Sequence, residues 1–227
     1  MREETITIRD KTVIFDAQRI EAVPPTDLFH YARYDAAGES RLGRSTVHFI
    51  DHGDCRWVLR EYRRGGLVSR LVKSTYLYKG LDRTRMAWEF RLLAALSAKR
   101  LPVPKPVAAQ IVRRGVGYRG ALITERLPAT RTLGEALQHE SLTAARWRSV
   151  GHCIRVFHNN GVYHPDLNAN NIMLDNSRVY LIDFDRGRLL DPQVTAWQRA
   201  NVARLRRSLN KMKRLRPVFH FEEGHWR

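Results

Sequence analysis

The chain has 227 residues, 43% of them hydrophobic, which is enough to bury the core of one two-lobed domain or of two small domains. Its 40 Lys and Arg residues exceed its 23 Asp and Glu residues by 17, and this excess predicts a polyanionic partner. The sequence has no signal-peptide core and no run of about 18 apolar residues, which argues against a secreted or membrane-spanning protein, and we expect a soluble cytoplasmic one.

The first part of the chain is rich in β-favouring residues. Residues 1–30 alternate such runs with a break at two consecutive prolines, which indicates an extension laid against the first lobe. Two further runs, 45–50 and 56–62, flank turn-forming residues and predict a β-hairpin. The segment before this hairpin, 37–45, contains two glycines but no complete G-x-G-x-x-G pattern. A nucleotide-covering loop and a plain surface turn therefore both remain open.

A helix and an extended segment come next. Apolar residues recur at helical spacing across 84–98, at Met86, Phe90, Leu93 and Leu96. Glu89 lies beside this apolar stripe, near the boundary of the expected core. The alternating prolines of 101–106 end the helix because they fix φ and remove hydrogen-bond donors. Residues 121–127 then predict a strand that leaves the first lobe.

Two helices are expected before the central polar segment. Thr132 and Glu135 have the spacing of a capping box, which opens a short helix. Apolar residues at helical spacing predict a longer helix over 141–160, and the Asn-Asn-Gly sequence that finishes at Gly161 stops it. This longer helix leads directly into the segment that begins at residue 162.

That segment contains the most informative residues of the sequence. Asp166 and Asn171 lie five residues apart in His-Pro-Asp-Leu-Asn-Ala-Asn-Asn, and Asp183 follows in Ile-Asp-Phe. A kinase needs a carboxylate to orient and deprotonate the attacking hydroxyl, a carboxamide five residues later and a second carboxylate to hold Mg²⁺. Two short β-rich runs, 172–174 and 179–182, predict a hairpin with Asn171 and Asp183 at the same end. The pattern therefore predicts ATP-dependent phosphoryl transfer.

The same residues have a purely structural interpretation. Asp166 and Asn171 could cap a turn while Asp183 ends a strand, as short polar residues often do. The two apolar neighbours of Asp183 argue against this alternative, since they would bury its charge unless a cation compensates it.

A kinase also needs a glutamate that pairs with a basic residue of its third strand. Glu89 is the candidate for this glutamate. The alternative is an exposed glutamate that interacts only with Arg85, four residues earlier.

The end of the chain is strongly basic. Apolar residues at helical spacing in 199–216 predict an amphipathic helix with a cationic outer face. The segment contains no acidic residue and eight cations: Arg199, Arg204, Arg206, Arg207, Lys211, Lys213, Arg214 and Arg216. Three interpretations remain open, namely a solvated face over a core-packing helix, attraction to an anionic membrane surface, and binding to nucleic acid phosphates.

Several motifs carry a resemblance that goes beyond kinases in general. They are Arg-Glu-Tyr-Arg-Arg-Gly-Gly-Leu at 60–67, the helix segment 83–93, Leu-Pro-Val-Pro-Lys-Pro at 101–106, Leu-Ile-Thr-Glu at 122–125, and His-Pro-Asp-Leu-Asn-Ala-Asn-Asn at 164–171. Together they resemble the kinases of 3-deoxy-D-manno-octulosonic acid (Kdo), which belong to the lipopolysaccharide kinase family. The similarity runs from about residue 43 to residue 216.

The resemblance implies an α+β, bilobal, protein-kinase-like fold. A β-rich N-lobe with an N-terminal extension would occupy 1–125. A mainly helical C-lobe, with the catalytic loop and the basic C-terminal helix, would occupy 126–227.

The resemblance also implies roles for individual residues. Asp166 would be the catalytic base, with Asn171 and Asp183 as Mg²⁺ ligands and Glu89 as the helix glutamate. Arg60 stands where kinases usually have a lysine and would reach the phosphates of ATP, with Lys73 and Lys79 as alternatives. The remaining nucleotide contacts would come from a phosphate loop and from backbone groups near the adenine: Gly43, Arg44, Ser45 and Thr46, then Glu125 and Leu127.

The activity implied is transfer of the γ-phosphate of ATP to the 4-hydroxyl of Kdo on Kdo-lipid A. The expected location is the cytoplasmic face of the inner membrane of a Gram-negative bacterium, with an anionic membrane surface as a further partner. The alternatives are a heptose kinase of the same family, a kinase of a soluble metabolite, and a non-catalytic basic module that binds RNA. We expect no nucleic acid partner, because no interleaved aromatic motif that stacks bases occurs.

Overall fold

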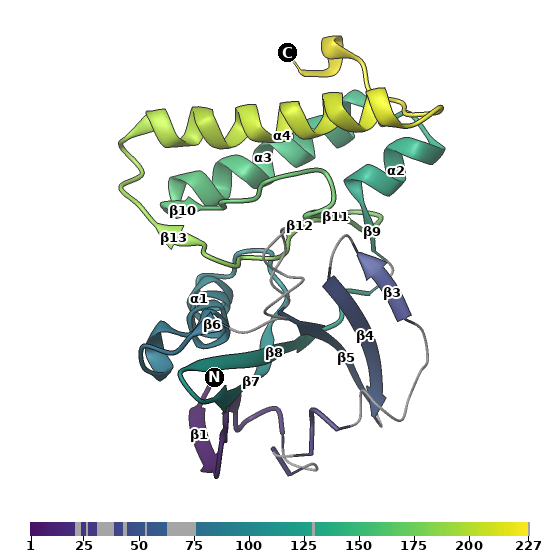
Figure 1. Cartoon of the computed structure of the whole chain (residues 1–227). Helices are drawn as coiled ribbons and strands as arrows, with labels where there is room; N and C mark the ends of the chain where they lie inside the picture. The colour runs from purple at the N-terminus through teal and green to yellow at the C-terminus, as the bar shows by residue number, and fades with distance from the viewer. Residues whose placement is uncertain are drawn as a thin grey trace. The chain divides into compact units, whose positions relative to one another are not determined.

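The computed structural model describes the chain except residues 21–23, 26, 31–38, 43–44, 53, 63–75, 129 and 227, and it leaves undescribed the side chains of 39–42, 45–46, 52 and 225–226. The chain forms two compact units (Figure 1). Unit 1 comprises Met1–Ala95 and Pro104–Arg126, and unit 2 comprises Leu96–Val103 and Leu127–Arg227. No helix within the described ranges is long and apolar enough to cross a membrane.

An antiparallel sheet forms the framework of unit 1. Its strands are β1 (Glu3–Ile8), β2 (Lys11–Asp16), β3 (Glu39–Leu42), β4 (Ser45–His52), β5 (Cys55–Glu61), β6 (Tyr76–Leu77), β7 (Pro106–Arg114) and β8 (Gly117–Glu125). The order in the sheet is β1-β2-β7-β8-β5-β4-β3, and β6 pairs with β8 beside this path. The hairpin predicted at 45–62 is confirmed as β4 and β5. Within the segment 1–30, expected to be an extension, β1 and β2 are part of the sheet, because β1 pairs with β2 and β2 pairs with β7.

Helix α1 (Arg85–Ala98) follows the short 3₁₀ helix η3 (Leu81–Arg83). The predicted stripe is confirmed, since Met86, Phe90, Leu93 and Leu96 are all buried. Met86 packs against β8 at Gly120, where an added Cβ would lie 3.0 Å from the methionine methyl group. Glu89 shares the buried side of the helix and is 1% exposed.

Unit 2 is mainly helical. Its elements are β9 (Arg131–Thr132), α2 (Leu133–His139), α3 (Ala144–Asn159), β10 (Val162–Tyr163), β11 (Ile172–Leu174), β12 (Val179–Leu181), β13 (Arg188–Leu189), α4 (Thr195–Leu215) and the 3₁₀ helix η4 (Glu223–Trp226). The predicted capping box is confirmed, because the Thr132 hydroxyl accepts from Glu135 N at 3.0 Å and the Glu135 carboxylate accepts from Thr132 N at 2.8 Å.

The two predicted helices of unit 2 are confirmed with shifted ends. Helix α3 begins after Thr143, whose side chain caps it, and ends at Asn159, as the Asn-Asn-Gly sequence predicts. The basic helix α4 begins at Thr195, four residues before the expected start at 199. The extended Val194 and Pro192 precede it, and they mark where the helix can begin. Asn201, Leu205 and Leu209 form its buried side.

Gly161 allows the chain to turn from α3 towards the catalytic segment. Its φ is 72°, a left-handed conformation that side chains disfavour. A Cβ added there would lie 2.3 Å from the carbonyl oxygen of Leu190. The backbones also bond at this point, since Leu190 N donates to Gly161 O at 2.7 Å. A side chain therefore has no room at this position.

We expect Gly161→Ala to lower the free energy of unfolding by about 2 kcal/mol or more, because it combines left-handed strain with a clash against backbone. The matched control is Gly151→Ala within α3, where a Cβ meets nothing within 4 Å. That substitution should raise stability by about 0.5–1 kcal/mol, since alanine favours helix over glycine. Urea unfolding followed by circular dichroism measures both, and equal stabilities would contradict the role assigned to Gly161.

Candidate active site

The predicted catalytic loop, residues 164–171, connects β10 to β11 and begins at a buried histidine. His164 Nδ1 accepts from the backbone N–H of Asp166 at 3.2 Å, so Nε2 carries the proton and donates to the carbonyl of Ile182 at 2.8 Å. Burial lowers the pKa of the His164 imidazole, although the bond to Ile182 and the charges of Asp183 and Asp166 oppose this effect. His164 is therefore a neutral group that fixes the loop backbone.

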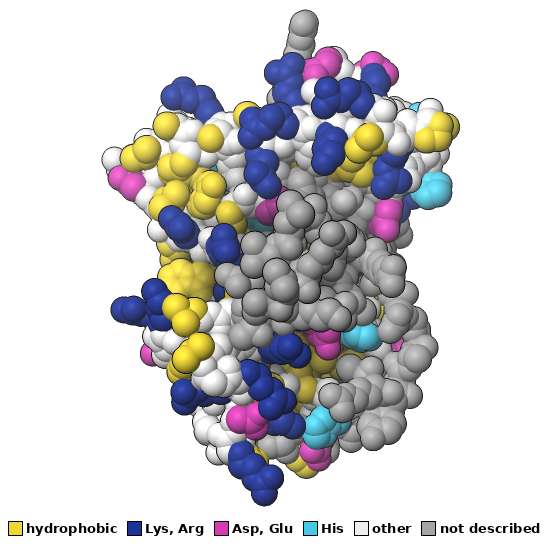
Figure 2. Space-filling view, in the orientation of Figure 1, with side chains coloured by type: hydrophobic (Ala, Val, Ile, Leu, Met, Phe, Trp, Pro, Cys, Tyr) yellow, Lys and Arg dark blue, Asp and Glu magenta, His cyan; other side chains and the backbone are white. Residues whose placement is uncertain are grey.

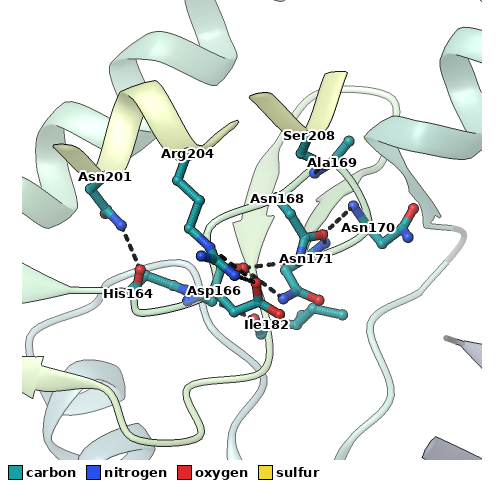
Figure 3. A network of polar contacts seen from close by, with 10 residues as sticks. All are labelled: His164, Asp166, Asn168, Ala169, Asn170, Asn171, Ile182, Asn201, Arg204 and Ser208. Carbon is teal, nitrogen blue, oxygen red and sulfur yellow. Dashed lines mark hydrogen bonds and ion pairs between the residues drawn. The ribbon is translucent and has the colours of Figure 1, made fainter. Parts of the chain in front are cut away.

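Asp166 is half exposed, with 51% of its side chain accessible. Its Oδ1 accepts two hydrogen bonds from Arg204 of α4, one from Nε at 3.1 Å and a second from Nη2 (Figure 3). Partial burial acts to raise the pKa of Asp166, but the bonds from Arg204 and Asn168 and the charges nearby outweigh it, and the pKa lies below the usual value. The carboxylate is therefore ionised at neutral pH.

Two asparagines close the loop on itself. Asn168 Oδ1 accepts from the backbone N–H of Asn170 at 2.8 Å and of Asn171 at 3.2 Å. The amide nitrogens of Asn168 and Asn171 both donate to the carbonyl of Asp166, at 3.0 and 2.9 Å (Figure 3). The side-chain nitrogen of Asn171 is used in this way. No described residue donates to its Oδ1, so this oxygen remains available for a ligand.

The predicted β11–β12 hairpin is confirmed. Ile172 pairs with Leu181, and Ile182 N donates to the carbonyl of Asn171 at 3.1 Å. Asn171 comes directly before β11, and Asp183 comes shortly after β12. Because the two strands are antiparallel, both residues lie at the same end of the hairpin. Asp183 has a φ of 63°, a conformation uncommon outside glycine that turns the chain out of β12.

The oxygen atoms of these residues fit a magnesium ion. Mg²⁺ usually binds one or two carboxylates, the phosphates of a substrate and several waters. The Asp183 carboxylate and the free Oδ1 of Asn171 match that chemistry. Within the described ranges, no group of three or more His, Cys, Asp and Glu side chains forms a metal cluster, so the ion would depend on nucleotide oxygens and water for its other ligands.

A second polar cluster lies in unit 1, between β5 and α1. Arg60 Nη2 donates to Glu89 Oε2 at 2.5 Å, and Tyr62 also donates its hydroxyl to this oxygen. Arg60 is 18% and Glu89 1% exposed. The interpretation of Glu89 as an exposed surface residue is therefore wrong. Sequence analysis missed Tyr62, whose ring also lies 4.6 Å from the Arg60 guanidinium carbon.

The expected phosphate loop falls mostly outside the described residues. Gly43 and Arg44 are not described, and Ser45 and Thr46 begin β4 without described side chains. Of the two lysines considered in place of Arg60, Lys73 also lies outside the described residues. Lys79 is exposed, and no contact with a described acid is found for it.

The two residues predicted near the adenine lie where β8 ends. Glu125 N donates to the carbonyl of Lys105 at 2.8 Å, so this amide is already used. The Glu125 carboxylate pairs with Arg19 and, at 3.8 Å, with Lys105. Leu127, two residues later, is partly buried, and its carbonyl accepts from the Thr130 hydroxyl at 3.4 Å.

Comparison with known proteins identifies the family of this chain. The model of the lipopolysaccharide kinase (Kdo/WaaP) family matches residues 31–220. The chain belongs to this family. The resemblance drawn from the sequence motifs is therefore confirmed.

Two relatives of this lipopolysaccharide kinase carry the name 3-deoxy-D-manno-octulosonic acid kinase. The protein of Xanthomonas oryzae pv. oryzae is 41% identical over 203 residues, which cover 88% of this chain and 81% of that protein. The protein of Stenotrophomonas maltophilia is 42% identical over 214 residues, which cover 91% of this chain and 83% of that protein.

Among solved structures, the Rio2 kinase–ADP/Mg²⁺–phosphoaspartate complex from Chaetomium thermophilum is similar with a TM-score of 0.54. The sequences are 19% identical, and the match covers 86% of this chain and 65% of that chain. This likeness concerns the fold alone. It confirms the predicted α+β, protein-kinase-like fold of the lipopolysaccharide kinase.

We expect Arg60→Ala to lower the free energy of unfolding by about 3–5 kcal/mol, because it removes the guanidinium that contacts the buried carboxylate of Glu89. Arg60→Lys should cost less, since it keeps the positive charge. The control is Arg114→Ala, which breaks an ion pair with Asp10 whose side chains are 65% and 42% exposed, and should cost less than about 1 kcal/mol. Chemical denaturation measures all three, and equal losses for Arg60→Ala and Arg114→Ala would contradict this account.

Proposed function

We propose that this lipopolysaccharide kinase transfers the γ-phosphate of ATP to the 4-hydroxyl of Kdo attached to lipid A. The names of relatives at 41–42% identity, aligned over most of the chain, support Kdo as the acceptor sugar. The observation that carries the reaction is the grouping of three side chains. Asn171 and Asp183 lie at one end of the hairpin, and Asn171 donates to the backbone of Asp166.

Asp166 acts as the base. Its lowered pKa keeps the carboxylate ionised at neutral pH, and its partial exposure leaves it accessible to a hydroxyl group. It accepts the hydrogen bond of the attacking 4-hydroxyl and takes up the proton as the oxygen bonds to the γ-phosphorus, while the bond from that phosphorus to the bridging oxygen breaks and ADP leaves. The main contribution of the carboxylate is orientation, because phosphoryl transfer depends chiefly on positioning and electrostatics.

Asn171 and Asp183 hold Mg²⁺ through their side-chain oxygens. When bound, this ion neutralises charge on the β- and γ-phosphates. Arg60, oriented by Glu89 and Tyr62, binds the α- and β-phosphates. Gly43, Arg44, Ser45 and Thr46 cover the phosphates with backbone groups, and backbone near Glu125 and Leu127 binds the adenine.

The outer face of α4 attracts an anionic membrane surface, and the expected place of action is the cytoplasmic face of the inner membrane. Figure 2 shows Lys and Arg side chains gathered over this helix. Three of its cations are paired, because Arg204, Arg206 and Lys213 contact Asp166, Glu223 and Glu222. Four others make no ion pair with a described residue: Arg199, Arg207, Lys211 and Arg214.

These four cations form the docking face. At 3.6 residues per turn they lie within an arc of about 120°, roughly opposite the buried Leu205 and Leu209. A lipid acceptor keeps its acyl chains in the bilayer, so an enzyme that phosphorylates its sugar has to work at the membrane surface. The docking face supports this proposal, since each cation close to an anionic surface contributes about 1 kcal/mol.

We expect Asp166→Ala to lower kcat about a hundredfold to ten-thousandfold, the range for loss of a general base, while the fold is kept. The control is Glu140→Gln, which neutralises another exposed, ion-paired carboxylate of unit 2 and should keep full activity. The assay follows ATP-dependent gain of one phosphate by mass spectrometry. It offers Kdo-lipid A, heptosylated core and soluble sugars in parallel, and phosphate gain on another acceptor alone would replace the proposed substrate.

We expect the triple variant Arg207→Gln, Lys211→Gln and Arg214→Gln to bind anionic vesicles at least about tenfold more weakly, because it removes three cations of the docking face. Activity on detergent-dispersed acceptor should change less. The control removes the same charge from other surfaces of unit 2, at Lys99, Arg148 and Arg155, all exposed. Vesicle co-sedimentation measures both, and equal losses would reduce the effect to net charge and reject the docking face.

A further inference from the structure

Helix α4 holds the catalytic loop at three positions of one face. Asn201 Nδ2 donates to the carbonyl of His164 at 2.5 Å, and the Ser208 hydroxyl accepts from the backbone N–H of Ala169 at 3.3 Å. Arg204 lies between these two contacts and bonds to the base, Asp166 (Figure 3). Asn201 and Ser208 already fix the helix to the backbone of the loop. The role assigned to Arg204 above is limited to its effect on the pKa of Asp166.

The contact of Arg204 with Asp166 is not the strongest pairing that a guanidinium can make. A guanidinium and a carboxylate pair best when two N–H groups meet two oxygens in parallel. Here Nε and Nη2 both bond to Oδ1. Arg204 is 47% exposed, and its Nη1 bonds to no described residue. The guanidinium therefore keeps donors for a further anionic group beside the base.

The proposed acceptor brings such a group. Kdo is a 2-ulosonic acid, in which C2 bears the carboxylate and C4 bears the hydroxyl, with one methylene between them. When the 4-hydroxyl bonds to Asp166, the acceptor carboxylate must come close to the carboxylate of the base. Two like charges close together near a protein surface repel each other unless a cation lies between them. Arg204 is the described cation that contacts Asp166.

We propose that Arg204 binds the carboxylate of the acceptor sugar next to its reacting hydroxyl. This inference rests on the proposed function and names the group that recognises the acceptor. Arg204 shares its donors between Asp166 and the acceptor carboxylate, so that one cation compensates both charges. It selects, over a neutral sugar, a sugar acid in which one methylene separates the carbon that bears the carboxylate from the carbon that bears the hydroxyl.

The γ-phosphate of ATP is the other anionic group that approaches the base. Asn171 and Asp183 would hold Mg²⁺, and this ion would compensate the phosphate charge. The acceptor carboxylate has no such compensation from the groups assigned so far. The acceptor carboxylate is therefore the ligand that we assign to Arg204. The experiment below distinguishes this assignment from binding of the γ-phosphate by Arg204.

The experiment crosses a change in the protein with a change in the acceptor. Kdo-lipid A and its carboxamide derivative are offered, with ATP, to the wild type, Arg204→Ala, Arg204→Lys and Arg206→Ala. Arg206 is the matched control, because it is an exposed arginine on α4, two residues away, whose partner is Glu223 and not the base. Thermal unfolding of each variant verifies that it is folded.

We expect the wild type and Arg206→Ala to prefer the carboxylate over the carboxamide at least about tenfold in kcat/KM, the value of one charge-assisted contact. Arg204→Ala should accept both acceptors almost equally, with the loss on the carboxylate acceptor mainly in its KM. Arg204→Lys should recover part of the preference, because lysine keeps the positive charge but lacks the paired N–H donors of the guanidinium.

Two results overturn the inference. If Arg204→Ala keeps the tenfold preference, the carboxylate is bound elsewhere. If it raises the KM for ATP, or lowers kcat equally for both acceptors, Arg204 serves the γ-phosphate or only the base. A failure of the proposed function looks different, since the wild type itself would then phosphorylate neither Kdo acceptor.

Discussion

The catalytic loop depends on polar side chains that bond to its backbone. Residues 164–171 contain no strand, so their peptide groups cannot be satisfied by a ladder. The amides of Asn168 and Asn171 donate to the carbonyl of Asp166, and the buried imidazole of His164 accepts from the N–H of Asp166, so these side chains supply the missing partners. The loop is therefore fixed before reactants arrive. This preorganisation is what phosphoryl transfer requires, because its barrier is lowered mainly by groups that do not have to reorganise.

Helix α4 connects this loop to the charged surface of unit 2. Its buried side supplies Asn201, whose Oδ1 accepts from His158 Nε2 at 3.1 Å and whose Nδ2 donates to His164 O at 2.5 Å. Its opposite side carries the docking face. One rigid element thus fixes the base and presents cations to solvent. A shift of α4 would change the position of Arg204 relative to Asp166, so the proposed membrane contact and the proposed acceptor binding involve the same helix.

Much of this arrangement could be predicted from the sequence because the signals are local. The spacing of Asp166, Asn171 and Asp183, together with a turn between two short β-rich runs, predicts the hairpin and the residues at its end. The apolar stripe of α1 and the stop at Gly161 are equally local. Glu89 required one further step, since the kinase pattern and not the helical spacing predicts a glutamate on the buried side of α1.

The contacts that could not be predicted join residues far apart in the chain. Tyr62 and Glu89 are 27 residues apart, and Arg204 and Asp166 are 38 apart. Neither pair has a periodic signal, because the distance between them depends on how whole elements pack. Asn201 is a further case, since a polar residue on the apolar side of an amphipathic helix looks like an imperfection until its partners are known.

The same limit applies to charge. The net charge of +17 counts every cation equally. It therefore does not reveal which cations a partner can reach. Arg206 and Lys213 are neutralised by Glu223 and Glu222, which follow α4 in the chain, and Arg204 contacts the base. The pairing concentrates the available charge on the face opposite the buried leucines. The proposed membrane partner would therefore meet Arg199, Arg207, Lys211 and Arg214. Sequence periodicity alone did not separate these four cations from the paired ones.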